Sequence, residues 1–246
     1  MATTEFGAPE RILSFLGYGN PAGLWFVGKE EGLGQMDDDD QRANLSARRR
    51  FDPVMDLQAA HLALRERGQA CDLTKWLPRT QVWRWAAKIS RAVSGASDWR
   101  NPERARDYIR HSLGRTNGHT FITNLSPIPE KGGSSGRPWR RQFEEALPSG
   151  MLDTLLVKRH QALKDLILAY KPTAIICHGK PRSAHRAFML GDQPAPANEP
   201  RIEAYDPADG PPVFICPFLG VGQMRTEDAE LLVKMLVDRG VKLQAV

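Results

Sequence analysis

The alternation of strand-like and helical segments is the feature that most constrains the fold of this chain. Four short apolar runs, LWFV, FIT, TAII and VFIC, have the composition of buried strands. Around them the chain repeats one order of elements: a strand, a turn that contains glycine, and a helix. This alternation predicts a mainly parallel sheet flanked by helices. We therefore expect an α/β fold, a three-layer α/β/α sandwich around a central sheet of about four strands.

The segment between the first two strand-like runs is expected to be helical. Residues 52–115 show helical apolar spacing throughout, and 246 residues suffice for one sizeable α/β domain with such an insertion. We predict a single domain over 1–246 with a helical insertion at about 36–115. Aromatic residues at helical spacing are typical of a core, and we favour that interpretation for Trp83.

Cysteine usage and hydropathy exclude several classes of protein. The three cysteines lie far apart and form no CxxC pair, which argues against a disulfide framework and against a cysteine-rich metal or iron–sulfur site. No segment approaches the roughly 18 consecutive apolar residues of a membrane span, and no leader-like pattern is seen. We expect a monomeric, cytoplasmic protein without a membrane partner.

Arginine dominates the basic residues, and the net charge is +5. Guanidinium groups form bidentate hydrogen bonds with phosphate, so this charge suits a nucleic-acid partner, although a generic basic surface fits it equally well. Arg137, Arg140 and Arg141 surround Trp139, a combination that suits phosphates and a stacked base. The alternative is a solvated loop that enters a helix.

Polar residues follow the strand-like runs. Glu30 and Glu31 follow the first run, Asn124 the second and His178 the third. Ligands of open parallel sheets bind outside the carboxyl ends of the strands, so we expect these side chains to line one site. Carboxylates can orient water or stabilise a cation, an amide both donates and accepts, and an imidazole can transfer a proton. Each residue also has a structural interpretation, as a solvated turn acid, a turn-forming asparagine or a satisfied strand-end histidine.

The order of four stretches resembles the uracil-DNA glycosylase superfamily. These stretches are WFVGKEEG, FITNLSPIP, IICHGKP and FICPFLGVGQMR, within the sheet segments at about 24–32, 119–129, 173–187 and 212–239. The superfamily places an acid after the first strand, an asparagine at the end of the second, a glycine after the third and a His-Pro-Ser motif after the last. The resemblance implies a protein that binds DNA or a nucleobase and hydrolyses the N-glycosidic bond of a damaged base, without a metal ion or other cofactor.

The resemblance also implies roles for individual residues. Glu30, with Glu31 beside it, would position water and stabilise the cationic sugar as the glycosidic bond breaks. Asn124 would read the edge of the base, and His178 would donate a hydrogen bond to the leaving base. Glu31 stands where the superfamily has proline.

Backbone groups and the last loop complete the expected site. Gly28 and Gly32 would bring the backbone of the first turn close to the base. The loop that holds Gln223 and Arg225 would insert near the nucleotide that such enzymes extrude from the stack. Cys216 takes the position of the motif histidine among the base contacts, and a thiol is a weaker hydrogen-bond donor than an imidazole.

Two alternative functions remain open. A non-catalytic module on the same fold would bind nucleic acid without releasing a base. A metal-dependent hydrolase of small molecules or nucleotides would use Glu30 and Glu31 to hold a divalent ion. The sequence contains no GxxxxGK[ST] loop, no GxGxxG after a strand and no GxSxG elbow, which argues against the nucleotide sites and the nucleophile that these motifs form.

Overall fold

The computed structural model describes residues 9–30, 38–66, 69–70, 72–75, 77, 80–128, 138–191 and 193–244. The strands of the main sheet are β1 (Gly17–Gly19), β2 (Leu24–Gly28), β3 (Val54–Met55), β6 (Thr120–Asn124), β7 (Ala174–His178), β8 (Glu203–Tyr205) and β9 (Val213–Cys216). A separate antiparallel pair consists of β4 (Arg65–Glu66) and β5 (Gln69–Ala70). The helices are α1 (Pro9–Leu13), α2 (Asp38–Arg48), α3 (Leu57–Ala63), α4 (Gln81–Val93), α5 (Pro102–His111), α6 (Pro138–Ala146), α7 (Met151–Tyr170), α8 (Arg182–Leu190) and α9 (Thr226–Asp238).

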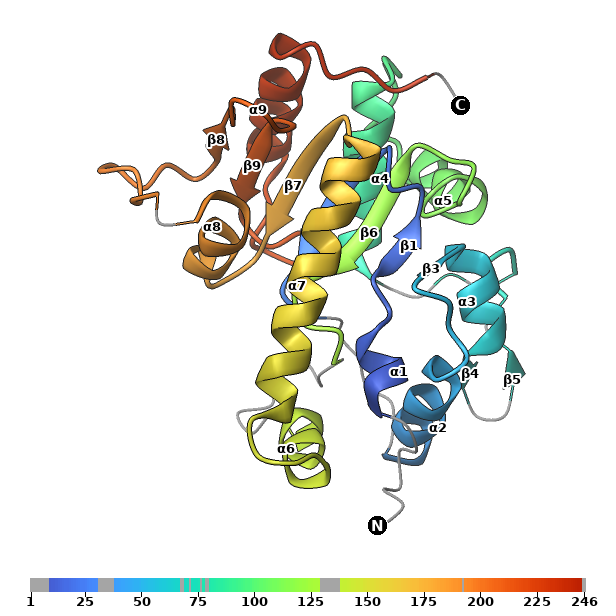
Figure 1. Cartoon of the computed structure of the whole chain (residues 1–246). Helices are drawn as coiled ribbons and strands as arrows, with labels where there is room; N and C mark the ends of the chain where they lie inside the picture. Colours follow the sequence, from blue (N-terminus) through green and yellow to red (C-terminus); the bar gives the residue numbers. More distant parts are fainter. Residues whose placement is uncertain are drawn as a thin grey trace.

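The predicted α/β fold with a mainly parallel sheet is confirmed. The four expected strands are β6, β2, β7 and β9, which lie side by side in this order and are all parallel (Figure 1). Their side chains are buried on both faces of the sheet. In β2, for example, Trp25 and Phe26 point to opposite faces and both are fully buried. A strand buried on both faces has a continuous apolar sequence, and this is why the four runs were recognisable.

The sheet has seven described strands, which is more than the expected four. Strand β1 pairs antiparallel with β6, β3 pairs with β1, and β8 pairs antiparallel with β9. The sequence of β1 is Gly-Tyr-Gly, and a Cβ on Gly19 would lie 2.2 Å from the carbonyl oxygen of Thr120. These glycines permit a close approach of two backbones, but they remove the apolar signal by which a strand is recognised.

The segment between β2 and β6 contains helices α2 to α5. The prediction that 52–115 is helical throughout is wrong, because three short strands lie within it. Val54 and Met55 form β3 at the edge of the main sheet, and β4 pairs with β5 after α3. Two-residue strands of this kind have no periodic pattern of their own, so the helical spacing of the surrounding residues masked them.

Helices pack against both faces of the sheet. One core cluster joins β2 and β7 to side chains of α3, α4, α5 and α9, and the other joins the same strands to α7 and α8 (Figure 1). Trp83 of α4 is partly buried against the first cluster, which confirms the core interpretation of this residue. Among the described helices, none is long and apolar enough to cross a membrane.

Candidate functional site

Four residues named from the sequence form one row across the carboxyl ends of the parallel strands. Asn124 is paired with Gly28, and His178 is paired with Cys216. Gly28 follows the pair of Val27 and Cys177, which places it beside His178. Neighbouring strands are about 4.8 Å apart, so the row extends over roughly 15 Å. We call Asn124, Gly28, His178 and Cys216 the strand-end row.

Gly28 leaves space that the side chain of Asn124 fills. A Cβ on Gly28 would lie 2.2 Å from Asn124 Oδ1 and 3.3 Å from His178 Cε1. The carboxamide of Asn124 and the ring of His178 therefore converge over the backbone of Gly28. The structure brings together three residues that the sequence analysis placed at one site.

The carboxamide of Asn124 is available to a ligand. Its side chain is half-buried and makes no hydrogen bond to another described residue, so the expected alternative of a turn-forming asparagine is not observed there. The backbone around it is fixed, because the N–H of Leu125 donates to the carbonyl of Gly28 at 2.9 Å and Arg159 Nη2 donates to the carbonyl of Asn124 at 2.8 Å. Within the described part of the chain, the site thus presents a donor and an acceptor without partners, on a hydrogen-bonded backbone.

His178 is neutral at pH 7. Burial, assisted by the nearby His185, lowers the pKa of His178 to about 3. The side chain is buried, and its Nδ1 has no hydrogen-bond partner among the described residues. The expected alternative of a satisfied strand-end histidine is therefore not observed for Nδ1. A neutral imidazole carries one N–H donor and one acceptor nitrogen, so His178 can donate a hydrogen bond to a ligand without being a cation.

Phe218 adds an aromatic surface beside His178. The two ring centroids are 5.7 Å apart, and Phe218 is 37% exposed. A Cβ on Gly220 would lie 2.4 Å from the phenyl ring, so the ring rests on a backbone that has no side chain. The sequence analysis missed Phe218. The available signal was an aromatic residue directly after the Cys-Pro pair that ends the last strand.

Glu30 lies in the loop that borders the strand-end row. The loops that follow β2 and β6 remain joined beyond the sheet, since Ser126 N–H donates to the carbonyl of Lys29 at 2.7 Å. The Glu30 carboxylate is half-buried and lies 3.7 Å from Lys29 Nζ. Glu31 and Gly32, the other residues expected in this turn, lie outside the described residues.

Cys216 occupies the end of the row, but its thiol packs in the hydrophobic core. The side chain has no exposed surface, and burial raises its pKa to about 12. The thiol is therefore neutral at pH 7 and offers no exposed atom to a ligand. Its neighbours in the core cluster include Phe214 and Leu219.

The expected phosphate contacts on α6 are engaged in ion pairs. Arg140 pairs with Glu144 at 2.8 Å and with Asp153 at 3.3 Å, and Arg141 pairs with Glu145 at 2.9 Å. Such pairs are typical of a solvated helix face, the alternative interpretation of this segment. Helix α6 lies at the end of the molecule towards which the arrows of β7 and β9 point (Figure 1). Arg137 and the side chain of Trp139 lie outside the described residues.

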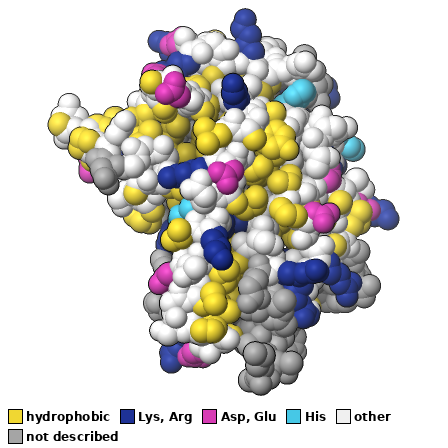
Figure 2. Space-filling view, in the orientation of Figure 1, with side chains coloured by type: hydrophobic (Ala, Val, Ile, Leu, Met, Phe, Trp, Pro, Cys, Tyr) yellow, Lys and Arg dark blue, Asp and Glu magenta, His cyan; other side chains and the backbone are white. Residues whose placement is uncertain are grey.

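The loop after β9 leaves two polar side chains in solvent. Gln223 and Arg225 are both exposed, and the N–H of Arg225 donates to Asp228 Oδ2 at 3.1 Å where α9 begins. Figure 2 shows Lys and Arg side chains scattered over the face drawn, between hydrophobic and acidic ones. Charge on this face therefore does not by itself mark a nucleic-acid surface.

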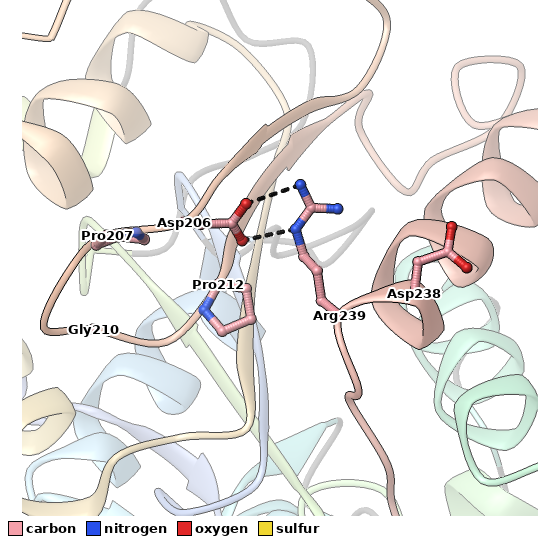
Figure 3. Close-up of a pocket in the computed structure, with 6 residues that line it drawn as sticks. All are labelled: Asp206, Pro207, Gly210, Pro212, Asp238 and Arg239. Atoms are coloured by element: carbon pink, nitrogen blue, oxygen red, sulfur yellow. Dashed lines mark hydrogen bonds and ion pairs between the residues drawn. The ribbon is translucent and has the colours of Figure 1, made fainter.

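A hollow of about 480 Å³ lies at the other end of the sheet (Figure 3). Its lining includes Pro212, which directly precedes β9, and Asp238 at the end of α9. Arg239 donates two hydrogen bonds to the carboxylate of Asp206 across this hollow, at 2.7 and 3.0 Å. None of the residues expected at the site lines it, and the charges of its arginine and this aspartate already neutralise each other.

No group of three or more His, Cys, Asp and Glu side chains in the described ranges is placed to hold a metal ion. No model of a known protein family matches the chain, and no curated protein matches it either. We therefore infer the function from the residues of the site and from the resemblance of their motifs.

Proposed function

We propose that the chain is a uracil-DNA-glycosylase-like protein with a three-layer α/β/α architecture, whose strand-end row binds a nucleobase in DNA and promotes hydrolysis of its N-glycosidic bond. The observation that supports this best is the convergence of Asn124 and His178 over Gly28, where a Cβ would lie 2.2 Å from Asn124 Oδ1. The resemblance to the superfamily gives base recognition to Asn124 and to the backbone at Gly28.

Recognition of the base would rest on the carboxamide of Asn124, which bonds no other described side chain or backbone group. An amide presents a donor and an acceptor side by side, which is complementary to the carbonyl and N–H groups on the edge of a base such as uracil. Phe218 offers a partly exposed aromatic face next to His178, and a planar base stacks on such a face. Neutral His178 can donate a hydrogen bond to a base oxygen.

Cleavage would rest on the carboxylate of Glu30. A negative charge near the breaking bond stabilises the cationic sugar of the transition state, and it does so more strongly where solvent is partly excluded. Glu30 is half-buried and follows Gly28 by two residues in the loop that is hydrogen-bonded to the end of β6. No residue in this scheme needs a metal ion.

A non-catalytic binding module is the second candidate, and the charge state of the row favours it. The two side chains nearest the position of the motif histidine are both neutral, because burial lowers the pKa of His178 to about 3 and raises that of Cys216 to about 12. A neutral donor stabilises a departing anionic base less than a cation does.

Base release from labelled single- and double-stranded oligonucleotides tests the proposal. The substrates contain uracil, hypoxanthine or xanthine, and the buffer contains EDTA. Glu30→Gln and Asn124→Ala are each expected to reduce the rate of release about a hundredfold. The matched controls Glu227→Gln and Asn117→Ala, both at exposed positions, are expected to retain it.

Each other result identifies a different function. Binding of the oligonucleotide without release would establish the second candidate. Release that needs a divalent ion would establish the metal-dependent alternative. Neither binding nor release, in a folded protein, would overturn both nucleobase proposals.

A further inference from the structure

Arg159 of α7 is a buried cation that no described carboxylate neutralises. It is 4% exposed, and its guanidinium donates to the carbonyl oxygens of Phe15 and Leu16 on one side. On the other side it donates to the hydroxyl of Thr123 at 3.4 Å and to the carbonyls of Asn124 and Leu125 at 2.8 and 3.3 Å. All five acceptors are uncharged oxygens of two chain segments, the turn before β1 and the end of β6.

These hydrogen bonds stabilise one relative position of the turn before β1 and the end of β6. A guanidinium has five N–H donors in a fixed planar fork, so acceptors that satisfy it must keep their relative positions. Such a charge without partners in the interior would be strongly unfavourable, because it would lose its hydration without compensation. A cavity of about 10 Å³ beside Arg159 has room for no more than about one water molecule, so most of the guanidinium donors depend on the protein's own oxygens.

The acceptors of Arg159 include the carbonyls of two consecutive residues, Asn124 and Leu125. Helix α7 covers one face of the sheet, and the side chain of Asn124 belongs to the other face, on the side of Ile122. Arg159 therefore holds the end of β6 from one face while the carboxamide reaches over Gly28 on the other. The N–H of Leu125 donates to the carbonyl of Gly28, and this hydrogen bond holds the end of β6 against the neighbouring strand β2.

We infer that Arg159 is a positioning residue, which sets the carboxamide of Asn124 for base recognition by holding the Asn124 and Leu125 carbonyls. This inference rests on the proposed function for its role in binding, but the geometric link between the two residues does not depend on any ligand. Lysine at this position would keep the charge but could not serve five acceptors at once.

The geometric link is tested without a ligand. The side-chain NH₂ signals of Asn124 in a ¹⁵N-labelled sample are assigned by their loss in Asn124→Asp. Arg159→Lys is expected to shift or broaden these signals and to leave those of the exposed Asn198 unchanged. The control Arg115→Lys alters another poorly exposed arginine, bound to Asp56 at 2.9 Å, and is expected to leave the Asn124 signals in place. Unchanged Asn124 signals in Arg159→Lys would overturn the inference.

The role in recognition is tested by a double-mutant cycle. The probe is a single-stranded oligonucleotide with one uracil, and its affinity is measured in EDTA. Arg159→Lys is expected to weaken binding about tenfold in the intact protein and less than about twofold in the Asn124→Ala background. A residue that only stabilises the fold would weaken binding by the same factor in both backgrounds, and this result would also overturn the inference.

Two further outcomes are distinguishable. Should the intact protein not bind the probe, the proposed function fails while the Asn124 signals still decide the geometric link. Should Arg159→Lys not fold, Thr123→Val removes one acceptor of the same guanidinium. The Asn124 signals are then expected to shift in Thr123→Val, and their staying in place would overturn the inference.

Discussion

The carboxamide oxygen of Asn124 lies where a side chain on Gly28 would begin. The distance from a Cβ on Gly28 to Asn124 Oδ1 would be 2.2 Å, shorter than real Cβ contacts. The two residues are register partners on β2 and β6, so their backbones cannot separate without breaking the centre of the sheet. Glycine at this strand end therefore leaves the carboxamide of Asn124 in its observed place, and no positive φ accounts for the glycine.

Gly28→Ala is expected to displace the carboxamide of Asn124 and weaken binding of a uracil-containing oligonucleotide about tenfold or more. The added methyl group overlaps the carboxamide, which must rotate away from the row, and such overpacking also lowers the free energy of unfolding by about 1 to 3 kcal/mol. Titration of the labelled oligonucleotide measures the first effect, and urea denaturation measures the second.

Gly210→Ala is the matched control for this substitution. A Cβ on Gly210 would lie 3.4 Å from Pro207, which is an ordinary contact. This variant is expected to bind as the intact protein does. Unaltered binding by Gly28→Ala would show that the contact with Asn124 plays no part in recognition.

Mild acidification, below about pH 6.5, is expected to destabilise the protein. Burial lowers the pKa of His178 to about 3 and that of His185 to about 4, so neither binds a proton in the folded state near pH 5. Both bind protons in the unfolded state below about pH 6.5. The free energy of unfolding therefore falls as the pH drops from about 6.5, by about 1.4 kcal/mol per pH unit for each histidine.

Urea denaturation between pH 5 and 7 measures this dependence. His185→Phe, which removes one buried imidazole outside the strand-end row, is expected to flatten the slope by about 1 kcal/mol per pH unit. His111→Gln alters an exposed histidine and is expected to leave the slope unchanged. Equal slopes for intact protein and His185→Phe would show that His185 is protonated equally in both states.

Sequence patterns were sufficient for the centre of the sheet and failed at its edges. β2, β6, β7 and β9 carry their own signal because both faces are buried. In contrast, β1 has glycine at two of its three positions, and β8 consists of Glu203, Ala204 and Tyr205. Both strands lie outside the four central ones, β1 next to the edge strand β3 and β8 at the opposite edge. They exist because neighbouring strands offer hydrogen bonds, and that information is not local to their sequence.

As with the sheet, only part of the candidate site could be predicted from the sequence. Gly28, Asn124 and His178 were recognisable because they follow buried strands. Their convergence depends on strand register, which a single sequence does not specify. Arg159 was missed although it lies four residues before Leu163, on the buried stripe of α7. A cation on an apolar helical stripe was the available signal.

Glu203→Gln is expected to destabilise the protein by about 3 kcal/mol without affecting the strand-end row. The buried carboxylate of Glu203 accepts hydrogen bonds from Arg182, Arg186 and Tyr205 at 3.1, 2.9 and 2.8 Å. Burial, the largest single cause, acts to raise its pKa, but the hydrogen bonds from Arg186, Tyr205 and Arg182 together with the charge of Arg186 lower it. Glutamine would leave two arginines without a counter-charge at the edge strand β8.

Chemical denaturation compares this variant with Glu145→Gln. Glu145 forms an exposed pair with Arg141, and its loss is expected to change the free energy of unfolding by less than about 0.5 kcal/mol. A similarly small effect for Glu203→Gln would show that the cluster around Glu203 contributes no more than a surface ion pair.

Arg225→Gln is expected to reduce the salt dependence of oligonucleotide binding. Arg225 is exposed in the loop after β9, at the same end of the sheet as the strand-end row, where a bound strand would bring its phosphates. Each phosphate contact contributes about 0.7 to the slope of log K against log salt for a single strand, so the slope should fall by about this amount. Lys242→Gln removes the same charge from an exposed position after α9, beyond the opposite end of the sheet, and is expected to leave the slope unchanged. Equal slopes for the two variants would show that the strand does not pass Arg225, because a contact that neutralises a phosphate must release its counterion.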